Sequence, residues 1–137
     1  SAAYVLRASM ALRDMDIARA EGALTRALAL NPVDLEALSV RAAARFLDDD
    51  TRGFAQLEKR VLELSPHYGA FYSKVAEFAE WEHRYPEIVG MFRRALRIDP
   101  EDPAARAGLG LGLLRMGEEQ KGLAQLRKAW ERDHFNV

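Results

Sequence analysis

The sequence predicts an all-α, right-handed solenoid of four helix-turn-helix hairpins, and three observations support this. Pro32, Pro66 and Pro100 are evenly spaced along the chain, and each follows a short polar residue of the kind that favours turns. Apolar residues between these prolines recur at helical spacing, not at the alternation of a strand. Small residues recur with the same period. The predicted repeats run over about 1–34, 35–68, 69–102 and 103–136.

Each repeat is expected to hold two helices joined by a short turn. A proline cannot continue the helix that it follows, so the repeats end at the prolines. In the fourth repeat Asp133 keeps the polar position but His134 replaces the proline, and we expect the same break over 133–136. Asp16 is the expected N-cap of its helix. The predicted helices span about 4–13, 17–30, 35–47, 52–64, 68–82, 86–98, 103–116 and 118–132.

The repeated residues resemble the tetratricopeptide pattern, in which W-x₂-L-G-x₂-Y is followed by A-x₃-F and a proline. The fourth copy carries Leu109 and Gly110 at the L-G pair. The second copy departs most, because Phe54 and Glu58 replace the usual alanine and large apolar residue. We therefore expect its second helix to be rotated or shifted by a residue. The recurring small residues are Ala8, Ala42, Ala76 and Gly110, and Ala27, Val61, Ala95 and Ala129.

The resemblance implies a protein–protein interaction scaffold that binds a peptide or helix in a concave groove lined by the first helix of each repeat. The groove lacks the Lys, Arg and Asn set with which some family members clamp a terminal carboxylate, so no such clamp is expected. The apolar residues predicted to line the groove could instead pack against their own neighbours, and the sequence leaves both interpretations open. The predicted groove residues are Val5, Leu12, Phe46, Glu77, Glu80, Leu111 and Leu114.

A narrower resemblance gives the alternative function. Residues 108–119 and 133–137 look like tetratricopeptide segments of large bacterial proteins, in which the array precedes a zinc metallopeptidase-like domain. This implies a non-catalytic regulatory or substrate-presenting arm, since the His-Glu-x-x-His motif itself is absent. We expect the chain to be a piece excised from a longer protein. Its end repeats lack obvious caps, which predicts possible self-association through exposed residues Leu123, Leu126 and Trp130.

Catalysis is not expected. No serine lies in a nucleophile elbow, and Gly108, Gly110 and Gly112 sit in an apolar helix, where close packing explains them better than a phosphate loop. Glu80 and His83 could form a ligand pair, but a metal site needs three or four ligands, so no metal and no cofactor are predicted. Histidines such as His67 are read as solvated turn residues.

Charge and composition limit the classes of partner. Lys and Arg number 20 and Asp and Glu 21, a balance that gives no general attraction to nucleic acid or anionic membranes. The cluster of Arg93, Arg94 and Arg97 is read as solvated surface. Arg7 and Arg41 replace apolar residues and could form a basic pair, although stems laid over the core are favoured. No compartment is indicated, with the cytoplasm slightly favoured.

Overall fold

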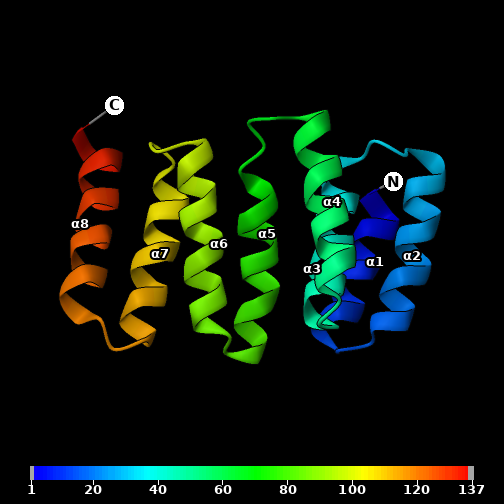
Figure 1. The fold of residues 1–137 in the computed structure, drawn as a ribbon, viewed down its shortest axis with the longest axis horizontal. Helices are drawn as coiled ribbons and strands as arrows, with labels where there is room; N and C mark the ends of the chain where they lie inside the picture. Colours follow the sequence, from blue (N-terminus) through cyan, green and yellow to red (C-terminus); the bar gives the residue numbers. More distant parts are fainter. Residues whose placement is uncertain (1, 136–137) are drawn as a thin grey trace.

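The computed structural model describes residues 2–135, with side chains described as far as Glu131. These residues form four helical hairpins that follow one another in sequence order, as a right-handed α-solenoid (Figure 1). The predicted fold class is therefore confirmed. The elements are Ala2–Arg13 (α1), Ile17–Leu30 (α2), Leu35–Leu47 (α3), Thr51–Leu64 (α4), Ala70–Ala79 (α5), Glu80–Glu82 (η1, a 3-10 helix), Tyr85–Ile98 (α6), Pro103–Arg115 (α7) and Glu119–Phe135 (α8).

The four turns inside the hairpins share one backbone conformation. Met15, Asp49, His83 and Gly117 occupy the same position in successive repeats, and each has a positive φ, between 55° and 81°. In each turn the next N–H donates to the carbonyl five residues earlier, at 2.8–3.4 Å, as in a Schellman motif. Glycine enters this region freely, whereas a β-carbon costs about 1–2 kcal/mol there. Three turns therefore adopt this conformation without glycine, because packing of the two helices requires it.

Aspartates cap the beginnings of four helices, α2, α3, α4 and α7. Asp34 and Asp102, two repeats apart, each accept a backbone N–H from the first turn of the helix that follows. The equivalent residue in the third repeat is Tyr68, which offers no carboxylate, and α5 accordingly begins at Ala70 rather than at the predicted residue 68. The same helix also ends early, in the 3-10 turn of residues 80–82. The other capping aspartates are Asp16, as predicted, and Asp50.

The recurring small residues form the seam between the helices. All eight of the positions predicted for this purpose are buried. At Gly110 an added Cβ would stand 2.9 Å from the carbonyl oxygen of Gly122 and 2.8 Å from Cγ of Leu126, so that α7 and α8 are nearly in backbone contact. Small side chains at these places thus allow the close helix approach on which the stacking depends.

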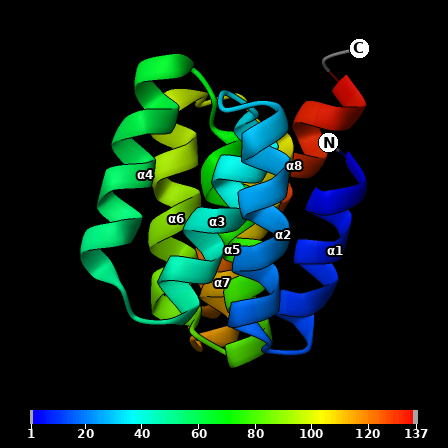
Figure 2. The same cartoon turned by 90° about the vertical axis from the view of Figure 1, so that its right-hand side faces the viewer.

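Consecutive hairpins do not meet in one uniform way. The helix α3 packs against both α1 and α2, α5 packs against α3, and α7 packs against α6. Viewed along the stack, α4 and α6 lie side by side on one side of the molecule (Figure 2). This alternation leaves one groove between α4 and α6 and another between α5 and α7.

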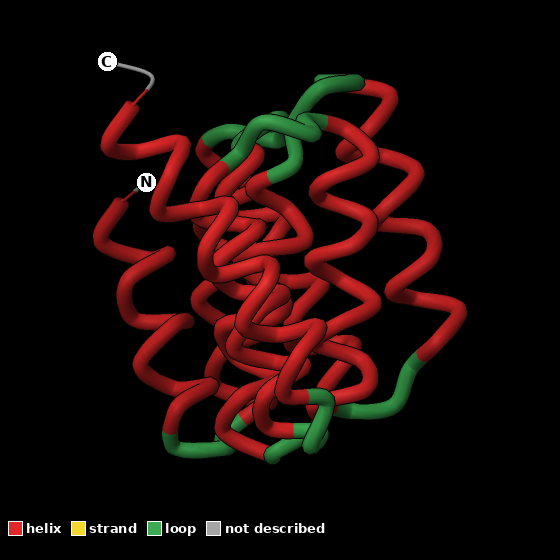
Figure 3. The backbone as a smooth tube through the Cα atoms, turned by 90° about the vertical axis from the view of Figure 1, so that its left-hand side faces the viewer, coloured by secondary structure: helices red, strands yellow, loops and turns green. Residues whose placement is uncertain are grey.

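Two predictions about the helices were wrong. The helix α4 begins and ends at the repeat positions where α2 begins and ends, so the expected shift of the second copy is not present. The expected break over 133–136 is also missing, because α8 continues to Phe135 (Figure 3). Without a proline at position 134, nothing in the backbone stops the helix. Residue 136, the predicted end of the fourth repeat, and Val137, the predicted first residue of a fifth, lie outside the described residues, as do the side chains of Asp133 and His134.

We predict that Gly110→Ala destabilises the protein by about 1–3 kcal/mol, because the new Cβ would overlap backbone at Gly122 that cannot rotate away. The matched control is Gly90→Ala in α6, where a Cβ would meet nothing within 4 Å. This control should gain about 0.5–1 kcal/mol from the better helix propensity of alanine. Urea unfolding measures both, and equal stabilisation by the two changes would contradict the close contact of α7 and α8.

Candidate functional site

A groove of about 360 Å³ opens between α5 and α7, with α6 as its floor. The wall formed by α5 and the start of η1, called the α5 wall, presents Glu77 and Glu80, and the α7 wall presents Leu111 and Arg115. The groove therefore combines an apolar floor with charged groups of both signs on its walls. The remaining lining residues are Ser73, Ala76, Tyr85, Ile88, Phe92, Ala104, Ala107, Gly108 and Gly112.

Two glycines of α7 allow the side chains of α6, which form the floor of the groove, to approach α7 closely. A Cβ on Gly108 would stand 2.4–2.6 Å from ring atoms of Phe92, and one on Gly112 would stand 2.9 Å from Cγ2 of Val89. Both glycines lie inside the helix Pro103–Arg115. The prediction that they serve helix packing rather than a phosphate loop is confirmed.

The polar groups of the groove are partly paired with one another. Glu77 lies 3.4 Å from Lys74 and 3.7 Å from Arg13, and its side chain remains 48% exposed. Arg115 donates to the hydroxyl of Tyr85 at 3.0 Å, and that hydroxyl also lies 2.8 Å from Nδ1 of His83. Glu77 thus already has two cations nearby but keeps about half of its side chain exposed, while Arg115 is held by the hydroxyl of Tyr85.

Three of the predicted groove residues come together here. Glu77, Glu80 and Leu111 line the same groove from two different hairpins, and Leu111 is 54% exposed. Leu114 does not join them, because its Cγ lies 2.8 Å from the Cβ position of Gly122, where it packs against α8. Whether any of these residues contacts a partner stays a prediction.

The predicted anchors Val5, Leu12 and Phe46 lie elsewhere. Val5 and Leu12 are 3% and 1% exposed, within the main core, so no ligand reaches them in this conformation. Phe46 lies in the groove between α4 and α6, where its ring contacts Phe54 edge-on at 6.0 Å between centroids. The expected uniform orientation of the first helices fails because consecutive hairpins meet in different ways.

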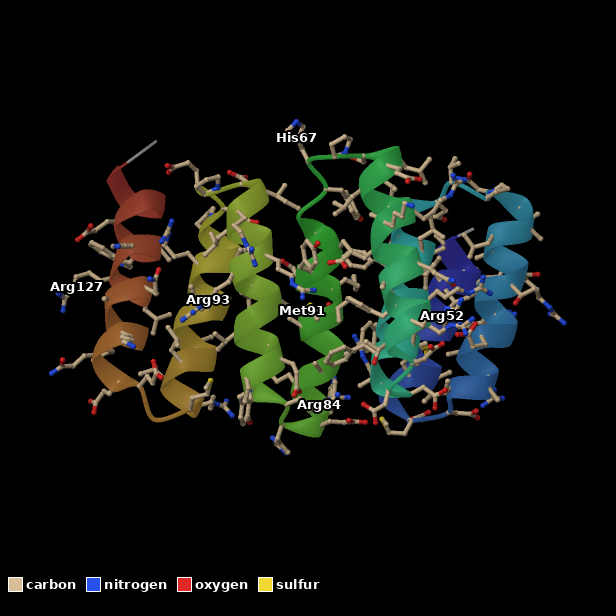
Figure 4. All side chains as sticks on the ribbon, viewed as in Figure 1. Arg52, His67, Arg84, Met91, Arg93 and Arg127 are labelled. Carbon is tan, nitrogen blue, oxygen red and sulfur yellow. The ribbon has the colours of Figure 1, made fainter. Side chains whose placement is uncertain are left out.

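Arg84 closes one end of the groove between α4 and α6, near the turn that precedes α6, with Met91 further along (Figure 4). Its guanidinium lies 4.3 Å from the ring centroid of Phe46 and donates to the Phe46 carbonyl at 3.2 Å. It also bonds Asp49 and Glu87, both at 3.0 Å. Burial opposes the charge, but these carboxylates outweigh it and raise the pKa of Arg84. Arg84 thus ties α6 to the second hairpin.

A tyrosine and an arginine hold one carboxylate at the other end of the same groove. The Tyr72 hydroxyl donates to Oε2 of Glu58 at 2.6 Å, and Nη1 of Arg94 bonds the same oxygen at 3.2 Å. Burial and then the bond to Glu58 raise the pKa of Tyr72. Glu58 departs from the family pattern because it meets this pair on the next hairpin, which explains one of the weaknesses of the second copy.

The two arginines that replace apolar residues have separate partners. Arg41 bonds Thr25 at 3.0 Å and lies 3.2 Å from Glu21, which also pairs with Arg45 at 3.1 Å. Arg7 lies over the ring of Tyr4, 5.6 Å from its centroid, on the outer face of the first hairpin. They have separate partners and so do not form one basic pair; the favoured interpretation, in which their stems lie over the core, stays a prediction.

Three further features concern metal binding, membrane spans and the basic cluster of α6. Within the described residues, no group of three or more His, Cys, Asp and Glu side chains is arranged to hold a metal ion. No described helix has the length and apolar character that a membrane span requires. In the cluster of Arg93, Arg94 and Arg97, the second is engaged with Glu58, and all three are exposed.

The groove residues that sequence reasoning missed include Tyr85, Ile88, Phe92 and Arg115. Arg115 could have been predicted, because it follows Leu111 by four residues and so lies on the same face of α7. Leu114 instead packs against α8. Tyr85, Ile88 and Phe92 belong to α6, a second helix of its repeat. They face the groove because α7 packs against α6 and leaves α5 apart.

Comparisons with known proteins support the fold. No family model matches this sequence, and no curated protein matches it. Among solved structures it is similar to MamA, a helical repeat protein of tetratricopeptide type, with a TM-score of 0.60 and 17% identity over 95% of this chain and 76% of the other. A MamA structure designated MSR-1 gives a TM-score of 0.59 and 18% identity, over 93% of this chain and 73% of the other.

A further MamA structure covers 96% of this chain and 91% of its own, with a TM-score of 0.52 and 15% identity. At such low identity these likenesses establish the fold alone. They give no support to the narrower resemblance to segments that precede a metallopeptidase-like domain, which stays a prediction.

We predict that Tyr72→Phe lowers the free energy of unfolding at pH 7 by about 1 kcal/mol, because Glu58 loses a hydrogen bond. The raised pKa of Tyr72 means that its contribution is complete below the ordinary tyrosine value, about 10, and is lost at higher pH, where the unfolded chain deprotonates first. The variant should therefore lose less stability than the wild type above this pH. Urea unfolding from pH 7 to 11 measures both effects.

The control for this experiment is Tyr4→Phe, two repeats earlier, which should leave stability at pH 7 unchanged. Identical alkaline slopes for Tyr72→Phe and the wild type would contradict the bond to Glu58.

Proposed function

We propose that this chain is a protein-interaction scaffold that binds an extended or helical peptide in the groove between α5 and α7. The proposal is supported chiefly by one observation: Glu77, Glu80 and Leu111, from two hairpins, converge over the apolar floor of α6. An exposed leucine in such a setting supplies an anchor, and polar groups around it supply orientation. The likeness in fold to MamA is consistent with a scaffold.

The charges of the groove define the preferred peptide. The α5 wall carries two carboxylates that remain exposed, whereas the guanidinium of Arg115 is engaged with Tyr85. A favoured ligand therefore has an apolar side chain that covers Leu111 and Phe92, with Lys or Arg close by for the α5 wall. An acidic peptide would lack these ion pairs and would be repelled.

This ligand class can be tested with peptides selected from a random library displayed on phage. We expect selected peptides to combine an apolar anchor with Lys or Arg, and to bind with a Kd that rises with salt. Leu111→Asp should weaken their binding at least about tenfold, since burial of a leucine contributes about 1.5–3 kcal/mol. Fluorescence polarisation with the purified protein measures this change.

The matched control is Leu6→Asp on α1, because Leu6 is 62% exposed and lies outside the groove. It should leave affinity unchanged. Glu77→Gln combined with Glu80→Gln should remove the preference for basic peptides and most of the salt dependence. Selected peptides that bind the Leu111→Asp protein as tightly as the wild type would refute the groove.

A further inference from the structure

The outer face of the first hairpin carries the residue types of a carboxylate-holding pair that the third hairpin uses. In the third hairpin, Tyr72 and Arg94 share one oxygen of Glu58, which reaches them from α4 of the preceding hairpin. The Arg94 guanidinium also lies 5.9 Å from the centroid of the Tyr72 ring. This pair is therefore a docking point for a glutamate on an adjacent helix.

The first hairpin carries the same residue types two repeats earlier. Tyr4 occupies the repeat position of Tyr72, and Arg26 occupies that of Arg94. Both line a groove of about 620 Å³ between α1 and α2. No described helix lies over this face in the way that α4 lies over the third hairpin.

The floor of this groove also repeats the template. Gly22 occupies the repeat position of Gly90, and a Cβ on either would meet nothing within 4 Å. In the third hairpin this open floor belongs to the groove between α4 and α6. Around Gly22 the floor is completed by Ala11 and Ala23, with Met10 beside them. No Cβ stands on α2 at this point, so the floor of the groove leaves room for the side chains of an incoming helix, as the floor at Gly90 does beneath α4.

Charge is where the two faces differ. Positions that hold Val75 and Glu87 in the third hairpin hold Arg7 and Arg19 in the first. The groove is thus lined by three arginines and a single carboxylate, Asp14. Throughout the described part of the chain, none of these three arginines takes part in an ion pair. The face therefore favours a partner that is more acidic than α4.

The geometry points to a second binding site on this outer face, which takes an acidic amphipathic helix of a partner protein. One glutamate of that helix binds Tyr4 and Arg26 as Glu58 binds the equivalent pair, and further carboxylates meet Arg7 and Arg19. Small apolar residues of the helix cover the alanines and Gly22. The site is separate from the groove between α5 and α7, and it does not depend on the function proposed for that groove.

A second copy of this chain is a poorer match for the site. The far end of the stack offers α8, whose described exposed charges are Glu119, Lys121, Arg127, Lys128 and Glu131. This helix is thus slightly basic, and Arg127 projects outward from it (Figure 4). Two basic surfaces repel each other, which favours an acidic partner over head-to-tail pairing.

The probe for this site is α4 itself, made acidic. It is a fluorescent peptide of residues 51–64 with Arg52→Glu, Lys59→Glu and Arg60→Glu, stapled between positions 56 and 63, opposite Glu58. We expect saturable binding to the wild-type protein. Arg26→Gln should weaken it about tenfold or more and Tyr4→Phe severalfold, because each removes a bond to a carboxylate.

Two controls separate docking from general attraction. Arg127→Gln removes the same charge at the opposite end and should change affinity less than about twofold. A probe with Glu58→Gln should bind the wild type weakly but lose little more on the Arg26→Gln protein, because the two changes remove the same bond. Leu111→Asp, in the groove between α5 and α7, should leave binding of this probe unchanged. A wrong proposal for that groove would therefore not affect the test of this site.

Three outcomes would overturn the proposal. The first is no saturable binding up to millimolar probe, and the second is an equal loss with Arg127→Gln and Arg26→Gln. The third comes from sedimentation equilibrium without the probe: an oligomer that Arg26→Gln dissociates would assign this face to a second copy of the chain.

Discussion

Close approach of helices at small side chains, repeated in every hairpin, is the constraint on which the rest of the structure depends. A single hairpin has too little apolar surface to be stable alone, and it gains stability by stacking on the next. Stacking at short range requires residues such as Ala8, Ala42 and Ala76, whose side chains are buried almost completely. The turns obey the same constraint, since even Met15 and Asp49 adopt a left-handed backbone in order to bring their helices together.

The grooves arise where this stacking is not uniform. Between the second and third hairpins, α5 packs against α3, and α4 reaches α6 through the polar contacts of Arg84 and Glu58. Between the third and fourth hairpins, Gly108 and Gly112 allow α7 to pack closely against α6, whereas α5 does not pack closely against α7. A perfectly regular array would bury these surfaces equally, so the candidate binding surface is a consequence of local glycine content.

The sequence predicted the fold well because its strongest signals are local and repeated. Prolines, capping aspartates and helical spacing gave the bounds of α2 and α3 as the structure has them. Errors fell where a repeated signal was lost: Tyr68 replaces a capping aspartate, and His134 replaces a proline. Groove residues were harder to predict, because a helix position faces solvent or core according to how neighbouring hairpins meet. Phe46 and Leu12 share a repeat position, yet one meets Arg84 and the other is buried in the core.

In a repeat protein, a contact made at one repeat position also indicates what the equivalent position of another repeat can bind. Tyr72 and Arg94 both bond a carboxylate from another hairpin, that of Glu58. This contact shows which chemical group the pair binds. Tyr4 and Arg26 occupy the same repeat positions as Tyr72 and Arg94. The added Arg7 and Arg19 would be costly beneath a neighbouring hairpin of balanced charge, since unpaired cations lose hydration on burial. Their presence therefore distinguishes this face from the internal junctions, and a helix bound to it would have to supply carboxylates.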